Sequence, residues 1–238
     1  MANYCKNYWR ERSATYEKVG WVKNNELLSV LLGFLPDYCQ TILDLGVGTG
    51  AFANIVSKNS YKVYGLDISL DMMTNVSDEV LKIQGDVQFL PFRANSIDCV
   101  VMRNVLHYIQ DKERTTREIY DVVKNDGYFL FSQVVPFSDE ISSEYDWLIG
   151  RNIHYPTINE VKSLYSIFNI EDITEIVLPS QSILNWLNNT KKSKKEKEEV
   201  LQRHHDTSKR YKSLVNYREN EKDIFVDMKH VSMKMKKF

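Results

Sequence analysis

The chain is poor in cysteine, carries no excess of charge and contains no long hydrophobic run. Cys5, Cys39 and Cys99 lie far apart without a Cys-x-x-Cys pair, so the sequence predicts neither a disulfide framework nor a metal site. Lysine and arginine number 31 and aspartate and glutamate 32, and this balance gives no global basic field for nucleic acid. No apolar run approaches the roughly 18 residues of a membrane span, and the N-terminus has no apolar signal core. We therefore expect a cytoplasmic, metal-free protein with a small-molecule partner and no membrane contact.

The chain contains enough apolar residues for a substantial core. Its 238 residues are 43% hydrophobic, which predicts one large domain or one domain with a cap rather than two independent domains. There is no internal repeat, and the only compositionally biased segment is Lys191–Glu199. Because acids interleave with its lysines, a solvated helix face is favoured there over an RNA contact.

A glycine-rich turn is the most informative local feature. Residues 43–50 read LDLGVGTG, in which Asp44 is followed by three alternating glycines where a short apolar run stops. This pattern predicts a strand that ends in a tight turn, with bare backbone close to a small ligand and a carboxylate beside it. Asp67 and Asp86 follow two later apolar stretches. One ligand with several donor groups would explain all three acids.

Spacing alone leaves a dinucleotide as an alternative ligand. Gly46, Gly48 and Ala51 fit the Gly-x-Gly-x-x-Gly/Ala fingerprint, and Asp67 lies about 20 residues beyond it, as a ribose-binding acid should. Charge separates the two ligands, because a pyrophosphate at this turn would meet the carboxylate of Asp44. S-adenosylmethionine has no phosphate, and its ammonium and sulfonium groups favour an acid.

Further motifs follow the glycine motif in order: GLDIS at 65–69, GD at 85–86 with LPF at 90–92, IDCVVMRN at 97–104 and KNDG at 124–127. On these motifs, residues 40–135 resemble the class I S-adenosylmethionine-dependent methyltransferases. This resemblance implies an α/β fold of Rossmann-like, doubly wound type, with a mostly parallel seven-stranded sheet, helices on both faces and a helical insertion or cap near the C-terminus. Many relatives carry proline where Asn125-Asp126 stands here, a difference that bears on turn stiffness rather than on chemistry.

The alternation of apolar segments gives the expected organisation of a single domain over 1–238. Strands are expected at 41–45, 62–66, 80–84, 97–102, 128–135, 173–178 and 223–235. Helices are expected at 26–35, from Ala51, from Ser69 as a possible N-cap, around 119–123, at 158–168, around 183–187 and at 194–214. The expected parts are an N-terminal lid segment (1–25), a cofactor-binding core (26–135), acceptor-covering insertions (136–156 and 181–216), and the last helix and strands (157–180 and 217–238).

The resemblance also implies roles for the residues at the strand ends. Asp67 would accept hydrogen bonds from the ribose hydroxyls while Ile68 packs on adenine, and Asp86 would accept from the adenine amine beside the Val87 amide. The full set of cofactor-binding candidates is Tyr16, Asp44, Gly46, Gly48, Asp67, Ile68, Met72, Asp86, Val87, Arg103 and Asn104. The competing interpretation is that strand-end acids are caps or solvated turn residues.

The acceptor side is less defined. His107 follows the fourth strand, where a neutral imidazole could act as a general base, although a packing role is an alternative. The substrate-binding candidates are Tyr8, Arg12, His107, Trp147 and His154. The aromatic N-terminal segment either folds over the ligands or packs an outer helix against the sheet. His204 and His205 are expected to face solvent.

The expected function is methyl transfer from S-adenosylmethionine to an oxygen, nitrogen or carbon atom of a small molecule, with S-adenosylhomocysteine as product. A tRNA or rRNA methyltransferase is an alternative, but the Asn/Asp-Pro-Pro-aromatic signature of base-amino methylation is absent after the fourth strand. A non-catalytic partner subunit is another alternative, and the intact acids Asp44, Asp67 and Asp86 argue against it. The sequence defines neither the acceptor nor the oligomeric state.

Overall fold

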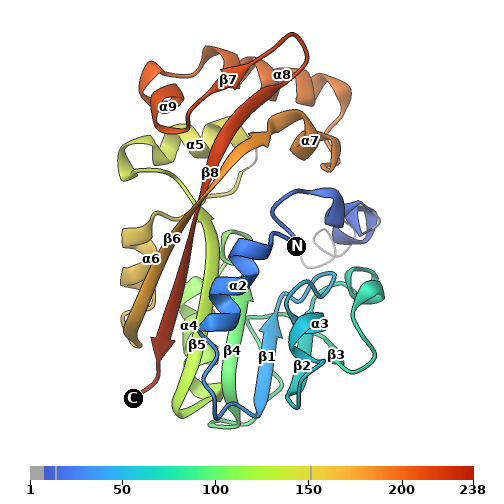
Figure 1. Ribbon diagram of the computed structural model, residues 1–238, viewed down its shortest axis with the longest axis vertical. Coiled ribbons are helices and arrows are strands. Elements are labelled where there is room, and N and C mark those ends of the chain that lie inside the picture. The colour runs from blue at the N-terminus through green and yellow to red at the C-terminus, as the bar shows by residue number, and fades with distance from the viewer. Residues whose placement is uncertain (1–7, 14, 151) are drawn as a thin grey trace.

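The computed structural model describes residues 8–13, 15–150 and 152–238, and its centre is one twisted sheet (Figure 1). The strands are β1 (Thr41–Leu45), β2 (Lys62–Asp67), β3 (Leu81–Gln84), β4 (Ile97–Arg103), β5 (Val123–Val135), β6 (Asn169–Ser182), β7 (Arg218–Glu219) and β8 (Ile224–Lys236). Their order is β3-β2-β1-β4-β5-β8-β6, and the two-residue β7 pairs with the start of β8. Strands β1 to β5 pair in parallel, whereas β8 is antiparallel to both of its neighbours. The doubly wound, mostly parallel fold is confirmed, with β7 added to the seven expected strands.

The helices flank the sheet and form a group at one end of it. The α-helices are α2 (Asn25–Gly33), α3 (Ala53–Val56), α4 (Lys112–Val122), α5 (Ser142–Ile149), α6 (Ile158–Leu164), α7 (Ile183–Asn188), α8 (Lys194–Asp206) and α9 (Lys209–Leu214). The described residues also form four 3-10 turns: η1 (Tyr16–Lys18), η2 (Leu70–Asn75), η3 (Leu106–Tyr108) and η4 (Asp139–Ile141).

Side-chain alternation along the strands builds a core on each face of the sheet. In β1, Ile42 joins the core that contains Leu31 of α2 and Val56 of α3. Leu43, on the opposite face, joins the core that contains Ile119 of α4. Both sets are buried, which explains why consecutive rather than alternating residues are apolar in β4 (99–102) and β5 (128–131).

A third core lies beyond the sheet and builds a cap. Apolar residues of α5, α7, α8 and α9 pack with the ends of β5 and β8, at the top of Figure 1. The expected helical insertion is therefore present, but the helix expected over 194–214 divides into α8 and α9 at Thr207. There the Thr207 hydroxyl and the Ser208 amide donate to the Glu144 carboxylate of α5 at 2.5 and 2.7 Å. These contacts replace the backbone bonds that would continue the helix.

Two other expected helices are shorter or tighter than the sequence indicated. The segment after Ala51 forms only the single turn α3, and the segment after Ser69 is the 3-10 turn η2. Ser69 makes no side-chain cap, and its backbone N–H donates instead to Asp67 Oδ1 at 2.9 Å. The Asp67 carboxylate at the end of β2 thus holds the residue that precedes η2.

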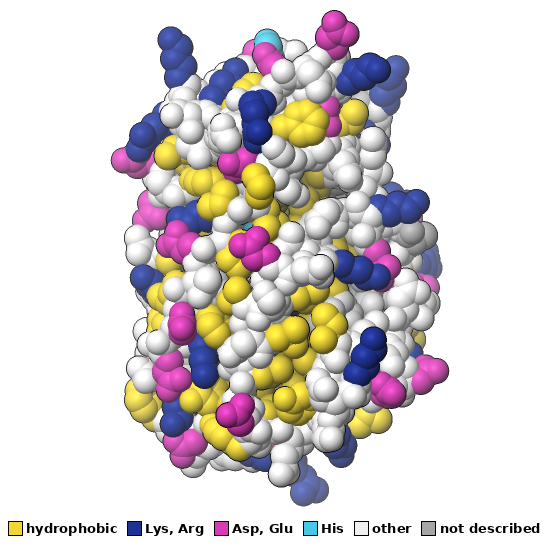
Figure 2. Space-filling model, viewed as in Figure 1, with side chains coloured by type: hydrophobic (Ala, Val, Ile, Leu, Met, Phe, Trp, Pro, Cys, Tyr) yellow, Lys and Arg dark blue, Asp and Glu magenta, His cyan; other side chains and the backbone are white. Residues whose placement is uncertain are grey.

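The surface carries both signs of charge in small groups. On the face shown in Figure 2, lysine and arginine alternate with aspartate and glutamate, and apolar side chains gather between them on its lower half. No helix in the described ranges combines the length and apolar character that crossing a membrane requires. Cys39 and Cys99 are buried and unbridged, and Cys5 lies outside the described residues.

Candidate functional site

The glycine turn after β1 adopts a backbone conformation that excludes side chains. Gly46, Gly48 and Gly50 all have positive φ, at 67°, 54° and 82°. A Cβ at Gly46 would also overlap a methyl group of Val105, in the segment that follows β4. The turn can approach this neighbouring loop, and a ligand beside it, only because these positions are glycine.

Asp67 joins the glycine turn to the next loop. Its Oδ2 accepts from the Gly48 amide and its Oδ1 from the Ser69 amide, both at 2.9 Å. Burial raises the pKa of Asp67, and these amide donors act in the opposite direction. Each carboxylate oxygen retains acceptor capacity for a second donor, such as a ligand hydroxyl.

Asp44 and Arg103 place opposite charges in the same buried region. Asp44, in β1, is 3% exposed, and burial raises its pKa to about 7 while Arg103 acts to lower it. Burial also lowers the pKa of Arg103. One guanidinium nitrogen of Arg103 donates to the Val22 carbonyl at 3.2 Å, and its Nε has no partner in the described part of the chain. Asp44 can therefore contact a cationic group of a ligand, and Arg103 can contact an anionic group of the same ligand.

The ends of the central strands surround a cavity of about 300 Å³. Every residue predicted to bind the cofactor lines this cavity: Tyr16, Asp44, Gly46, Gly48, Asp67, Ile68, Met72, Asp86, Val87, Arg103 and Asn104. The cavity lies at the carboxyl ends of β1, β2 and β4, next to the switch in strand order between β1 and β4, where ligands bind in doubly wound sheets.

Aromatic residues of the N-terminal segment cover the cavity, and sequence reasoning had left their role open. Trp9, Trp21 and Tyr108 line the cavity in addition to Tyr16. Burial raises the pKa of Tyr16 to about 12, so its hydroxyl remains a neutral donor. Aromatic residues spaced without helical or strand periodicity give no sequence signal for their position, and Trp9, Trp21 and Tyr108 were therefore missed as site residues.

A second, smaller cavity of about 80 Å³ adjoins the first. The two share Tyr16, Trp21, Asn104 and Tyr108 as lining residues. The rest of the second cavity is built from the cap and neighbouring segments, with Tyr145, Tyr155, Trp186, His204 and Tyr211 among its lining residues. Because the two cavities share part of their wall, a molecule in the second would lie next to a ligand in the first.

Two of the residues predicted to bind substrate, His107 and Arg12, line this second cavity. The His107 ring stacks on Tyr155, with centroids 4.4 Å apart and planes 22° apart, and its Nδ1 lies 2.8 Å from Gln133 Nε2. Arg12 is buried, and its Nε donates to the Asn189 carbonyl at 3.0 Å. Arg12 thereby ties the N-terminal segment to the end of α7.

The other three residues predicted to bind substrate, Tyr8, Trp147 and His154, line neither of these two cavities. Tyr8 accepts a hydrogen bond from Arg12 Nη1 at 2.9 Å and so supports that side chain. Trp147 is 48% exposed, under the guanidinium of Arg203. His154 lines a separate groove with residues of α4 and α6.

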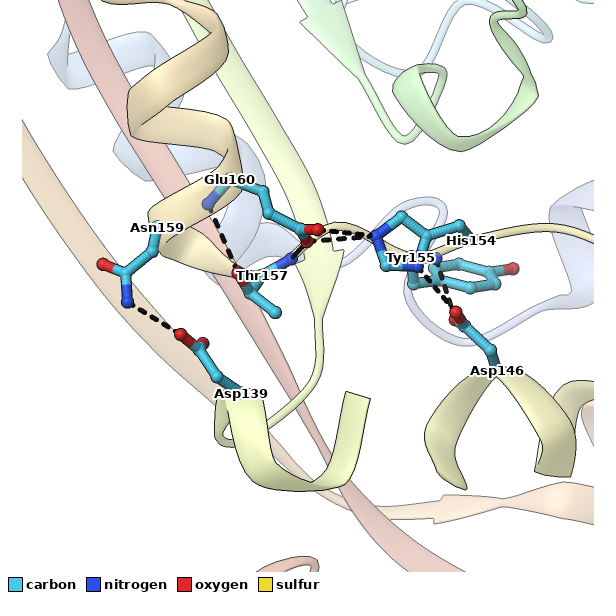
Figure 3. Close-up of polar contacts among 7 residues, drawn as sticks. All are labelled: Asp139, Asp146, His154, Tyr155, Thr157, Asn159 and Glu160. Carbon is cyan, nitrogen blue, oxygen red and sulfur yellow. Dashed lines mark hydrogen bonds and ion pairs between the residues drawn. The ribbon is translucent and has the colours of Figure 1, made fainter. Parts of the chain in front are cut away.

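His154 connects helices α5 and α6 (Figure 3). Its Nδ1 lies 2.6 Å from Asp146 Oδ2 on α5, and its Nε2 lies 3.0 Å from Glu160 Oε2 on α6. Burial lowers the pKa of His154, but the two carboxylates outweigh burial and leave it raised. The Tyr155 amide also donates to Asp146, at 2.9 Å. His154 therefore fixes the segment that carries Tyr155.

His204 was expected to face solvent, and that expectation is wrong. It is 3% exposed, because the side of α8 that carries Val200 and His204 packs into the cap. Its Nδ1 donates to the Val200 carbonyl at 2.8 Å, and burial lowers its pKa to about 4, so the ring is neutral. His205 is exposed, as expected, and contacts Glu219.

The comparisons with known proteins agree with the fold. Residues 43–131 match a family model described as a methyltransferase domain. YcgJ, an uncharacterized methyltransferase of Bacillus subtilis, is 26% identical over 155 residues, which cover 59% of this chain and 61% of YcgJ. Its solved structure superimposes with a TM-score of 0.78 at 17% identity, covering 90% of this chain and 99% of YcgJ. Residues 43–131 thus match the methyltransferase-domain family, and the fold is that of class I S-adenosylmethionine-dependent methyltransferases, which confirms the recognition made from the motifs.

Two further similarities, one in sequence and one in structure, are to proteins described as enzymes. Human arginine-hydroxylase NDUFAF5 is 34% identical over 100 residues, which cover 40% of this chain but only 29% of that relative. Phosphoethanolamine N-methyltransferase 2 of Haemonchus contortus, solved with S-adenosyl-L-methionine, superimposes with a TM-score of 0.60 at 18% identity. That likeness covers 95% of this chain and 57% of the Haemonchus protein.

Proposed function

We propose that this protein transfers a methyl group from S-adenosylmethionine to a small-molecule acceptor. The observation that carries the proposal is the position of Asp44, Asp67 and Asp86 around one cavity, beside a glycine turn with positive φ. A buried carboxylate at Asp44 opposes a pyrophosphate at this turn and favours a ligand with an ammonium and a sulfonium. The dinucleotide alternative is disfavoured for this reason.

Each part of the cofactor has candidate partners in the large cavity. The pair of oxygens on Asp67 would accept from the ribose hydroxyls, and Ile68 and Met72 would pack beside adenine. Asp86 would accept from the adenine amine near the Val87 amide, and its Oδ1 is held by the Gln88 amide at 2.9 Å. Asp44, Gly46 and Gly48 would surround the methionine portion, with Arg103, Asn104 and Tyr16 at its other side.

The second cavity is the proposed acceptor site. The bound cofactor supplies an electrophilic methyl group on a cationic sulfur, so this chain does not need a nucleophile of its own. Its residues align the acceptor, and alignment alone can supply several kcal/mol, about 7 to 11 in well-oriented intramolecular reactions. Lining residues from the N-terminal segment, from 145–155 and from 181–211 support the proposal that the lid and both insertions cover the acceptor. The small-molecule class and a cytoplasmic location remain predictions.

Transfer of an isotopic label tests this function. Incubation of the protein with methyl-labelled S-adenosylmethionine and a small-metabolite extract should give one or more labelled products by mass spectrometry. The same reaction with Asp67→Ala should give much less product, which controls for contaminating activities. Label found only in RNA, or no label in any fraction although the protein binds the cofactor, would contradict the proposal.

A further inference from the structure

We propose that Arg12 binds a carboxylate group of the methyl acceptor, and that this group is not the one that receives the methyl. Arg12 lines the second cavity and not the first, so an anion at its guanidinium would lie on the acceptor side. The role as an acceptor contact rests on the proposed function, whereas the affinity of this cavity for a carboxylate does not.

Arg12 is a buried charge without an acidic partner. Its side chain is 3% exposed, and its hydrogen bonds go to the Asn189 carbonyl and the Tyr8 hydroxyl. No aspartate or glutamate of the described residues forms an ion pair with it, and Glu11, its neighbour in sequence, contacts Lys191 instead. The residues outside the described ranges include no acid. Because an unpaired buried charge is costly, a counter-charge from a ligand is expected here.

Aromatic rings account for only part of the environment of this guanidinium. Its central carbon lies 5.1 to 5.3 Å from the ring centres of Tyr8, Trp9 and Tyr16. Such rings attract a cation, but they do not replace oxygen acceptors for the N–H groups in the guanidinium plane. Nε and Nη1 of Arg12 donate to protein oxygens, whereas Nη2 forms no hydrogen bond to a described residue. The protons of Nη2 are therefore left for a ligand.

The proposed cofactor site already contains both charges that the methionine part of the cofactor needs. Asp44 and Arg103 line the first cavity, and Arg103 acts on the carboxyl of Asp44 as an opposite charge. The ammonium and the carboxylate of the cofactor are thus matched by these two side chains. Arg12 is left over as a cation for a different ligand.

The acid in the wall of the second cavity is already neutralised. Asp227 is the acid among the described lining residues. Its carboxylate accepts from the Ser180 amide at 2.9 Å, from Asn216 at 3.2 Å and from Arg218 at 3.0 Å. Asp227 therefore has its own cation in Arg218, and the charge of Arg12 is not cancelled by it.

The remaining wall favours a ligand with one negative charge and an apolar body. Burial raises the pKa of Tyr145 and of Tyr211 and lowers that of His204 to about 4, so these three side chains are neutral. A single guanidinium in such a wall matches a carboxylate, which carries one charge and two oxygens for its N–H groups. A phosphate monoester carries more than one charge at neutral pH and would leave part of it unmatched.

The methyl group goes to an atom other than the carboxylate. A guanidinium stabilises the negative charge on the oxygens that it binds, and methylation of one of them would remove that charge and lose the stabilisation. An oxygen, nitrogen or carbon atom elsewhere on the acceptor supplies the electron pair of the new bond to the methyl carbon. The bond from that carbon to sulfur breaks with its pair on sulfur, and a proton on the reacting atom passes to solvent. The carboxylate remains on the product.

Matched charged and neutral probes test the carboxylate site without turnover. Benzoate and benzamide share a shape and differ in charge, and acetate and acetamide form a smaller pair. Ligand-observed NMR titrations, with and without S-adenosylhomocysteine, should show that the wild-type protein binds at least one carboxylate about tenfold or more tightly than its amide. Equal affinities within each pair, or no saturable binding of either carboxylate, would overturn the proposal whatever the outcome for the cofactor.

Substitution of Arg12 separates charge recognition from a structural role. Arg12→Met should weaken the carboxylate and leave its neutral amide bound as before, and Arg12→Lys should retain part of the preference. If Arg12 only fastens the N-terminal segment, both members of a pair should weaken equally, and that result would contradict the proposal. Arg203→Met is the matched control, because Arg203 also donates to a backbone carbonyl and lies over an indole ring without lining the cavity. Its preference should equal that of the wild-type protein.

The charge of the labelled product gives a second result once methyl transfer is observed. Passage of the metabolite extract over an anion exchanger at neutral pH should retain the acceptor, and the labelled product should be retained as well. An acceptor found in the unretained fraction, or a product that has become a methyl ester at its carboxylate, would contradict the assignment of Arg12. Absence of any labelled product would instead contradict the proposed function.

Discussion

Asp67→Ala should weaken binding of S-adenosylhomocysteine by about 1.5 to 3 kcal/mol, or roughly 10- to 150-fold, because it removes hydrogen bonds to a charged acceptor in a buried site. The variant also frees the Gly48 and Ser69 amides, which now bind the same carboxylate. Calorimetric titration of the variant and the wild-type protein measures the change in affinity. Thermal unfolding of the ligand-free proteins measures the change in stability separately.

Asp98→Ala is the matched control for this experiment. Asp98 and Asp67 are both 8% exposed strand acids, but Asp98 lies at the start of β4 and binds Thr41 and Lys124 away from the cavity. Its loss should lower the melting temperature and leave cofactor affinity within error. If Asp67→Ala behaves in the same way, then Asp67 has only a structural role and the assignment of the ribose contact is wrong.

Cofactor affinity should depend on pH through Asp44. Burial raises the pKa of Asp44 to about 7, so the carboxyl is partly protonated in the free protein at neutral pH. Only the ionised form can pair with the ligand's ammonium, so affinity should rise with pH up to about 7 and level off above it. Between pH 7 and pH 5 it should fall about 50-fold, because about half of the carboxyl is ionised at pH 7 and about one hundredth at pH 5.

Calorimetry from pH 5 to pH 8, in two buffers with different ionisation enthalpies, measures both this dependence and the proton released on binding. Asp67 also has a raised pKa and lies close enough to affect Asp44, so Asp44→Asn is needed to separate the two carboxyls. The asparagine variant should bind more weakly at pH 7 and lose most of the pH dependence. Affinity that stays constant over the range in the wild-type protein would contradict the proposed ammonium contact.

The cofactor side of the site was predictable from the sequence because local signals define it. Gly46 and Gly48 indicate a turn with positive φ. Asp67 and Asp86 follow short apolar stretches, and the parallel pairing of these stretches brings both acids to one edge of the sheet. The predicted cofactor residues at the strand ends line the cavity for this reason, although their individual contacts remain predictions.

The acceptor side depends on contacts that no local pattern reports. The second cavity is lined by Tyr145, Tyr155 and Tyr211, which come from different segments that meet only where the cap packs. Gln133, on the neighbouring strand, contacts His107. His204 stands among charged residues that indicate an exposed helix, yet the packing of α8 on α5 buries it. The burial and the neighbours of these residues follow from tertiary packing, which the local sequence does not report.

The most direct test of the account is calorimetric titration of the wild-type protein with S-adenosylhomocysteine and, separately, with NAD. The fold and the charges around the glycine turn predict binding of S-adenosylhomocysteine in the micromolar range or tighter, about −8 kcal/mol or better, and no binding of NAD. Saturable binding of NAD without any response to S-adenosylhomocysteine would contradict the account.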